Sequence, residues 1–157
     1  MTGGAGFIGS HIVDKLIAYH HKVTVIDIKP PHRDDVIFIK RDLLDLNPLI
    51  KCLKNVDLVF HLAAVSNIND AIKNPAHTVK VNILGTRNIL EAARINHLKR
   101  VILASTVWVY GSSNIYTSTK MTGEWLCRYY YERYLQSFTI LRYGIPYGPR
   151  ARDELAI

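Results

Sequence analysis

Short apolar runs alternate with longer amphipathic stretches along this chain of 157 residues. The apolar runs, rich in Val, Ile, Leu and Phe, predict strands at residues 23–27, 36–40, 56–61, 100–105 and 138–142. Helical periodicity fills the intervals at residues 9–20, 46–54, 76–96 and 116–135. Strands that alternate with helices form right-handed crossovers between parallel neighbours. The sequence therefore predicts an α/β fold, a doubly wound parallel sheet in a single domain of residues 1–157, with strands buried on both faces.

A glycine-rich segment, TGGAGFIGS at residues 2–10, is expected to follow a strand, but only Met1 and Thr2 precede it. In the common strand order 3-2-1-4-5-6, the first strand is central. We therefore expect the first strand to be missing and its two neighbours to need other backbone partners. Residues 150–157 follow the last strand and lead to no further element. We expect a chain truncated at both ends, without a C-terminal substrate-binding portion.

The composition narrows the classes of function. Lys and Arg outnumber Asp and Glu by 20 to 13, a net charge of +7, but no basic block is longer than two residues. Because a nucleic-acid footprint is a clustered patch, we expect no nucleic-acid partner and keep that function as a third alternative. No apolar run reaches the ~20 residues of a membrane span, and no signal peptide is recognisable. Cys52 and Cys127 form no C-x-x-C pair, so we expect a cytoplasmic protein, and the scattered histidines predict no metal site.

The glycine-rich segment satisfies G-x-G-x-x-G through Gly4, Gly6 and Gly9. Glycines allow a tight turn and let the backbone approach a pyrophosphate. A helix that opens near Phe7 directs its free N–H groups at the phosphates. The segment therefore predicts a dinucleotide-binding loop, and a strand–helix turn without any ligand is the alternative.

Asp27 stands eighteen residues past Gly9, at the end of the next predicted strand. An acid there accepts hydrogen bonds from the adenosine ribose, and its charge repels a 2′-phosphate, so the sequence favours NAD over NADP. Lys29 and Arg33 lie nearby and weaken that preference. Asp42, after the following strand, is placed to meet the adenine edge, or else to cap the next helix.

Tyr116 and Lys120 are four residues apart in YTSTK at the start of a predicted helix, so they share a face. A nearby ammonium stabilises a phenolate, and we expect Lys120 to lower the pKa of Tyr116 and make it a usable base. An ordinary exposed helix pair is the alternative. Ser105 and Thr106 end a predicted strand at the carboxyl edge, where open α/β sheets bind ligands, and a hydroxyl there can bond to a substrate oxygen.

The motifs that follow one another along the chain are TGGAGFIGS, the strand-ending Asp27, RDL at 41–43, HLAA at 61–64, VNILGTRNILEAAR at 81–94, STVWVYG at 105–111, YTSTK at 116–120 and LRYGIPYGPR at 141–150. In this order they resemble the extended short-chain dehydrogenase/reductases. The more specific resemblance is to the NAD-dependent nucleotide-sugar epimerase/dehydratase group typified by UDP-glucose 4-epimerase. It covers essentially the whole chain and implies an NAD(P)-binding Rossmann fold.

The resemblance implies a role for each matching residue. Thr106 corresponds to the catalytic Ser/Thr, Tyr116 to the general base and acid, and Lys120 to the lysine that holds the nicotinamide ribose. Further cofactor contacts are expected at Gly3, Gly6, Phe7, Ile8, Gly9, Asp27, Asp42, Leu43, Ala63, Ala64, Asn82, Ser105, Tyr143 and Pro146.

The implied chemistry is oxidation of a nucleotide-sugar carbinol and return of the hydride to the other face, as in an epimerase acting on a UDP- or dTDP-sugar. A sugar-nucleotide oxidoreductase of the same family and a non-catalytic truncated dinucleotide-binding protein are the alternatives. The family's 4,6-dehydratases carry Asp-Glu after the catalytic Thr, where this chain has Val107 and Trp108. Ile145 replaces an asparagine that contacts the substrate phosphate, and the segment at residues 112–115 is shorter than in the epimerases.

The resemblance also implies a homodimer through the helices at residues 76–96 and 116–135. The side chains expected at that interface are Ile89, Ala92, Ala93, Trp125 and Tyr129. His61, at a strand end, is expected to be a packed, hydrogen-bonded core histidine rather than a ligand.

Overall fold

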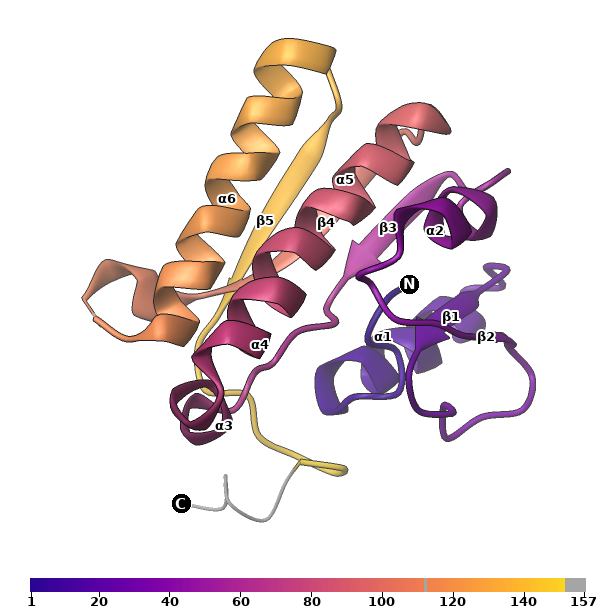
Figure 1. The fold of residues 1–157 in the computed structure, drawn as a ribbon. Coiled ribbons are helices and arrows are strands. Elements are labelled where there is room, and N and C mark those ends of the chain that lie inside the picture. Colours follow the sequence, from indigo (N-terminus) through magenta and orange to yellow (C-terminus); the bar gives the residue numbers. More distant parts are fainter. Residues whose placement is uncertain (112, 152–157) are drawn as a thin grey trace.

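The strands of this chain are all parallel. The computed structural model describes residues 1–111 and 113–151, and its strands are β1 (Thr24–Asp27), β2 (Ile37–Lys40), β3 (Leu58–His61), β4 (Arg100–Thr106) and β5 (Phe138–Tyr143). β1 pairs with β2, while β3, β4 and β5 pair in that order (Figure 1). All five predicted strands are confirmed, with ends that differ by one or two residues. Ser112 and residues 152–157 lie outside the described residues, so the predictions for 112–115 and 150–157 fall partly there.

Met1 and Thr2 lie between the two groups of strands. Thr2 bridges to Ile26 on one side and to His61 on the other, both in parallel sense. Its amide donates to the Phe60 carbonyl at 2.9 Å, and the Ile26 amide donates to the Met1 carbonyl at 2.8 Å. Met1 and Thr2 therefore supply the backbone partners that the neighbouring strands β1 and β3 were expected to need. They complete the order β2-β1-Thr2-β3-β4-β5 of a doubly wound sheet.

The helices follow the predicted positions, with one interruption. They are α1 (Phe7–Ala18), α2 (Leu46–Cys52), α3 (Ile68–Lys73), α4 (Pro75–Val79), α5 (Gly85–Ile95) and α6 (Ile115–Tyr134). The region predicted as one helix at 76–96 is divided, because a π-helical turn (Lys80–Leu84) separates α4 from α5. α3 and a short 3₁₀ helix (Val107–Tyr110) are additional to the predicted elements.

Asparagine side chains fix where three of these helices begin. Asn67, Asn74 and Asn114 each accept a hydrogen bond from the backbone N–H three residues on, at the starts of α3, α4 and α6. Such caps satisfy N–H groups that have no partner within the helix. α6 ends where Leu135 adopts a left-handed conformation with φ 55°. These local signals place Tyr116 in the first turn of α6.

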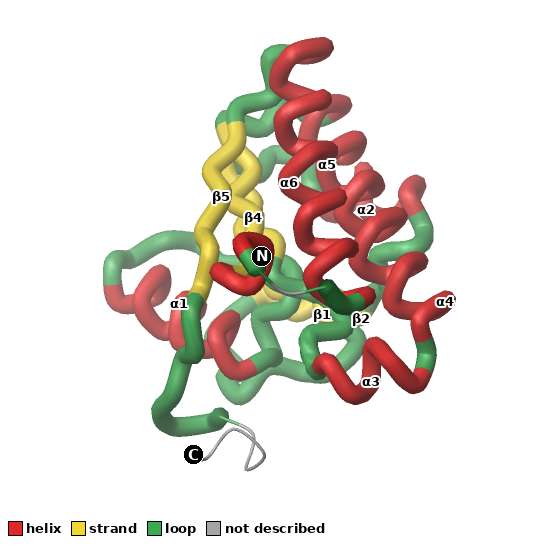
Figure 2. The backbone as a smooth tube through the Cα atoms, turned by 90° about the vertical axis from the view of Figure 1, so that its left-hand side faces the viewer, coloured by secondary structure: helices red, strands yellow, loops and turns green. Residues whose placement is uncertain are grey.

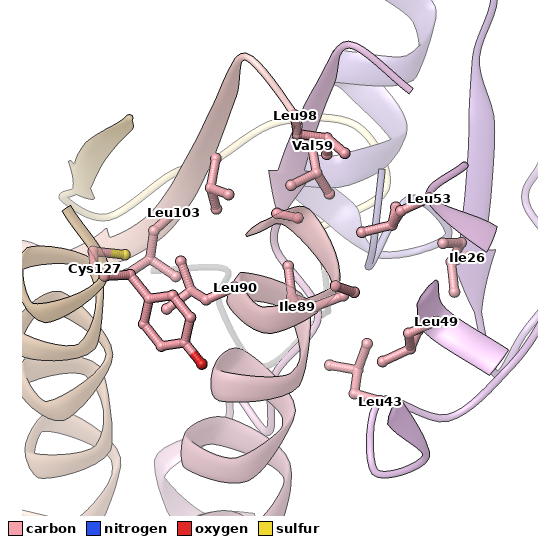
Figure 3. Packing of buried hydrophobic residues seen from close by; sticks show 14 residues of the cluster. Ile26, Leu43, Leu49, Leu53, Val59, Ile89, Leu90, Leu98, Leu103 and Cys127 are labelled. Atoms are coloured by element: carbon pink, nitrogen blue, oxygen red, sulfur yellow. The ribbon is translucent and has the colours of Figure 1, made fainter. Parts of the chain in front are cut away.

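Two apolar clusters lie on opposite faces of the sheet. The larger one packs α2, α5 and α6 against the face that carries Ile26, Val59 and Leu103. Figure 3 shows these side chains in one cluster with Ile89 and Leu90 of α5, where Leu103 lies next to Leu90. The smaller one packs α1 against the other face, through side chains that include Val13, Val25 and Phe60. The helices α5 and α6 lie along one side of β4 and β5 (Figure 2).

The prediction that the strands are buried on both faces is wrong for part of the sheet. Phe38, Leu58 and Leu141 are exposed, because α1 covers only part of its face. The prediction of the side chains at the dimer interface is also wrong in part. Ile89, Ala92 and Ala93 are fully buried in the core of this chain, whereas Trp125 and Tyr129 are exposed. Among the described residues, no helix is long and apolar enough to cross a membrane.

Candidate active site at the carboxyl edge of the sheet

Two glycines of the loop between Thr2 and α1 are required by the fold itself. Gly3 has φ +72°, and a Cβ at this position would lie 2.4 Å from the Ala63 nitrogen. A Cβ at Gly9 would lie 2.0 Å from the Gly3 carbonyl oxygen. Both distances are far below contact, so these glycines let the loop, the start of α1 and the end of β3 pack together.

Gly6 differs, because nothing in the chain itself requires a glycine there. Its backbone has φ −80° and ψ 173°, which any residue adopts, and an added Cβ would meet only the Gly3 oxygen at 3.4 Å. Gly6 also precedes the first turn of α1, which no side chain of the described residues caps. The loop thus offers a bare backbone surface and free N–H groups, which fit the pyrophosphate of a dinucleotide.

Asp27 connects the end of β1 to the glycine loop. Its carboxylate accepts hydrogen bonds from the Ala5 amide at 3.0 Å and from the Lys29 amide at 3.1 Å. The position next to the loop is the one expected for a group that meets the adenosine ribose. Arg33, which was expected to weaken the preference for NAD, forms ion pairs with Asp14 at 3.0 Å and Asp35 at 2.6 Å.

Asp42 and Leu43 lie on the loop that follows β2. Asp42 is exposed, and its side chain accepts from the Leu44 amide at 3.1 Å. It does not cap α2, whose N-cap is Asp45. Leu43 is buried, and its carbonyl accepts from the Asn88 side chain at 2.9 Å. The loop is therefore attached to α5, which leaves the Asp42 side chain on the outside.

A chain of hydrogen bonds runs through buried His61. The Thr2 hydroxyl lies 2.7 Å from Nδ1 of His61, and Nε2 lies 2.9 Å from Oγ1 of Thr86. Since the Thr86 hydroxyl donates to the Asn82 carbonyl at 2.6 Å, Nε2 must carry the imidazole proton and Nδ1 must accept from Thr2. Burial, with a smaller effect from the Lys120 charge, lowers the pKa of His61 to about 3. The prediction of a hydrogen-bonded core histidine is confirmed.

Asn82 joins three segments around the expected nicotinamide side of the site. Its amide oxygen accepts from the Val65 amide at 2.8 Å, and its nitrogen donates to the Val65 carbonyl at 3.1 Å and to Oγ1 of Thr119 at 2.9 Å. Asn82 belongs to the π-helical turn, a feature frequent at functional sites. It therefore attaches the loop after β3, which follows Ala63 and Ala64, to α6.

Tyr116 and Lys120 lie together on α6, next to the end of β4. The Lys120 ammonium donates to the Ala104 carbonyl at 2.9 Å and lies 5.8 Å from the centre of the Tyr116 ring. Burial lowers the pKa of Lys120 to about 8 and raises the pKa of Tyr116. The direction for Tyr116 is opposite to the expectation, because burial of the phenol outweighs the distant ammonium. An ordinary exposed pair is excluded, since Lys120 is buried.

Thr106 is the last residue of β4 and lies opposite Tyr143 of β5. Its hydroxyl accepts from the Trp108 amide at 3.3 Å and caps the 3₁₀ helix. The neighbouring Ser105 points elsewhere: its hydroxyl donates to Oε1 of Glu124 at 2.6 Å.

Phe7, Ile8, Tyr143 and Pro146 line one end of a cavity of about 560 Å³. Four expected cofactor residues are thus brought together from the two ends of the chain. The cavity continues along α1 as far as Tyr19, and its lining is mostly apolar.

Residues 1–156 match the NAD dependent epimerase/dehydratase family. This chain belongs to that family. Its membership confirms the resemblance found in the sequence, the α/β fold and NAD as the cofactor. Several of the relatives that this epimerase/dehydratase family member matches are named as enzymes of UDP-sugars.

Among the relatives, a putative UDP-glucose 4-epimerase of Methanocaldococcus jannaschii is 35% identical over 96% of this chain and 56% of its own length. A UDP-N-acetyl-alpha-D-glucosaminuronate decarboxylase of Bacillus cytotoxicus is also 35% identical, over 98% of this chain and 56% of its own length. Among solved structures, MoeE5 in complex with UDP-glucose and NAD has a TM-score of 0.89 at 32% identity, covering 98% of this chain and 56% of that one. This family member thus spans about half the length of its relatives.

Two residues next to the site were missed in the sequence. Glu124 lies four residues after Lys120 on α6, and Arg142 directly precedes Tyr143. Oε2 of Glu124 forms an ion pair with Nη2 of Arg142 at 2.6 Å. The spacing Lys120-x-x-x-Glu124 was the available signal, because residues four apart share a helix face.

Proposed function

We propose that this chain serves an NAD-dependent epimerase that acts on a nucleotide sugar, with a UDP- or dTDP-sugar as substrate. One observation carries the proposal. Tyr116 and Lys120 lie on one face of α6 against the end of β4, which carries Thr106, at the edge of the sheet where the glycine loop also lies. Parallel α/β sheets bind their ligands at this edge.

Each of the three residues has a defined task in this proposal. Tyr116, as the phenolate, takes the proton of the sugar hydroxyl and becomes the phenol, which returns the proton later, and the Thr106 hydroxyl donates a hydrogen bond to the same sugar oxygen. Lys120 binds the ribose and, with a pKa of about 8, carries its charge at neutral pH. Bound NAD supplies a reversible hydride acceptor and a cationic ring. These positive charges oppose the effect of burial on the pKa of Tyr116.

The residues after Thr106 favour an epimerase over a dehydratase. Elimination of water needs an acid and a base beside the sugar. Val107 and Trp108, which begin the 3₁₀ helix after Thr106, can provide neither. Retention of the keto-sugar and return of the hydride need no further titratable group, so the three residues above suffice.

The proposal has three further parts. Residues 1–157 act as a dinucleotide-binding domain, and the substrate pocket requires further residues of a longer protein. The chain forms a homodimer through α6, whose exposed face carries Met121, Trp125 and Tyr129 at intervals of four. The protein acts in the cytoplasm, which fits Cys52 and Cys127 as free thiols.

The test is to incubate the full-length protein with NAD and a UDP-sugar, and to follow both NADH fluorescence and the sugar products by NMR. We expect the 4-epimer to form without net accumulation of NADH. Tyr116→Phe should lower the rate by about 10²–10⁴-fold and leave NAD binding unchanged, because only the proton transfer is lost. Net NADH would instead indicate an oxidoreductase. NAD binding without any reaction would indicate a binding protein.

A further inference from the structure

Glu124 is a buried carboxylate at the centre of a polar network beside the site, a network that reaches the surface at Arg142 and Tyr110. The residue is 5% exposed. Its Oε1 accepts from the Ser105 hydroxyl at 2.6 Å and from Nε of Arg142 at 2.9 Å, and its Oε2 accepts from Nη2 of Arg142 at 2.6 Å. Both carboxylate oxygens are therefore occupied by donors from β4 and β5. Arg142 extends the network to the Tyr110 hydroxyl on the 3₁₀ helix.

Each donor is a chain neighbour of a residue with a task in the reaction. Ser105 directly precedes Thr106, and Arg142 directly precedes Tyr143, which lies opposite Thr106 in the register. On α6, Tyr116, Lys120 and Glu124 succeed one another at intervals of four, so they form one stripe along the helix. Lys120 and Glu124 hold consecutive residues of β4, through the Ala104 carbonyl and the Ser105 hydroxyl.

We propose that Glu124 is a positioning residue, which fixes the stripe of α6 that carries Tyr116 against the strand ends that carry Thr106 and Tyr143. The proposal rests on the proposed function. A bidentate carboxylate–guanidinium pair is directional as well as strong, so it restricts sliding of α6 along the strands. A displacement of 1 Å of a catalytic group lowers a rate by about 10²-fold.

The chain offers a matched control on the neighbouring helix. Glu91 of α5 also accepts two hydrogen bonds from an arginine, Arg94 at 2.7 and 3.1 Å, and one from the hydroxyl of Tyr130 at 3.0 Å. This network has the same chemistry, but these hydrogen bonds join α5 and α6 and involve neither β4 nor β5. Glu91→Gln therefore removes a comparable charge without affecting the strand ends.

The experiment compares Glu124→Gln, Arg142→Lys and Glu91→Gln in the full-length protein, after urea unfolding has shown that each is folded. In Glu124→Gln an amide N–H₂ faces the guanidinium, and in Arg142→Lys the fork of two donors is lost. For both we expect kcat to fall by about 10- to 100-fold, with the KM of the sugar and the Kd of NAD within about threefold of wild type. Glu91→Gln should change none of these constants by more than about threefold. Equal kcat values for Glu124→Gln and Glu91→Gln would overturn the proposal.

A second readout does not depend on turnover. Amide hydrogen exchange at Ser105, Thr106 and Tyr143 should be about tenfold faster in Glu124→Gln than in wild type, while exchange in β1 is unchanged. Glu91→Gln should show no such acceleration. If the wild-type protein epimerises no sugar, the proposed function fails, and this measurement alone decides the positioning role. Unchanged exchange at the three amides would refute it.

Discussion

At the scale of single residues, glycines in the same loop differ in role, and so do adjacent hydroxyl residues, although the residue type alone does not show the difference. The motif predicts a dinucleotide loop, but only the contacts separate Gly3 and Gly9, which the fold needs, from Gly6, which it does not. Ser105 and Thr106 were both expected at the ligand edge. Successive side chains of a strand point to opposite faces of the sheet. The sequence did not reveal that Glu124 lies on the face to which Ser105 points and accepts a hydrogen bond from its hydroxyl.

The glycines give a paired prediction. Gly6→Ala should change the free energy of unfolding by less than about 1 kcal/mol, since its Cβ has room, but should weaken NAD binding at least about tenfold by filling the pyrophosphate surface. Gly9→Ala should destabilise the fold by about 2 kcal/mol or more, because its Cβ would overlap the Gly3 oxygen. Urea unfolding and calorimetric NAD titration measure the two effects. Equal destabilisation by both variants would show that Gly6 is also a folding requirement.

At the scale of elements, the order of strands and helices was predictable because each has its own periodicity. The division of the helix at residues 76–96 was not, since a π-helical turn inserts one residue without changing composition. That turn contains Asn82, which bonds to the loop after β3 and to α6. The pKa of Tyr116 was predicted in the wrong direction for a similar reason. The spacing shows that Lys120 is near, but not that Lys120 is buried and Tyr116 partly buried.

The histidine that joins β3 to Thr2 and α5 predicts a loss of stability in acid. The pKa of His61 is about 3 in the folded protein, whereas an imidazole in the unfolded chain has its ordinary pKa of 6.5. Between pH 6.5 and 3, His61 is therefore protonated in the unfolded chain but neutral in the folded chain. The stabilisation is fully present above pH 6.5 and falls by about 1.4 kcal/mol per pH unit as the pH decreases toward 3.

Urea unfolding at several pH values between 7 and 4.5 measures this effect. We expect the free energy of unfolding of wild type to fall more steeply than that of His61→Gln, which has no imidazole to protonate. Other titrating groups are the same in the two proteins and cancel in the difference. Parallel pH dependences would mean that His61 is protonated in the folded chain.

At the scale of the whole molecule, the doubly wound topology follows from the alternation of elements, but the degree of burial does not. Helices on one face meet a full set of apolar side chains, whereas α1 covers only part of the other face and leaves Leu58 and Leu141 exposed. The sequence shows that a strand is apolar, but not which neighbour covers it. For the same reason, the side chains of α5 were wrongly predicted at a dimer interface, because the apolar side of α5 packs in the core of its own chain.

The proposed dimer predicts a change in oligomeric state on one substitution. Trp125 is 63% exposed and its ring lies 5.1 Å from the Arg128 guanidinium. Trp125→Glu should convert a dimer to a monomer in sedimentation equilibrium, because a buried aromatic anchor contributes most to such interfaces. Tyr19→Glu, directly after α1 at a side chain that is 73% exposed, is the control and should remain dimeric. A monomeric wild-type protein would contradict the dimer.

The hydrogen-bond chain from Ala63 to Asn82 has an evolutionary consequence. The Ala63 amide, the Thr2 hydroxyl, the His61 imidazole and the Thr86 hydroxyl each donate in the same direction, and every hydroxyl accepts at one side and donates at the other. Replacement of any one member leaves a buried neighbour without its partner, at a cost of about 1–3 kcal/mol. Drift at these positions is therefore restricted to coordinated replacements. Homologues should carry either the whole polar set or an apolar set of similar volume, and few mixtures of the two.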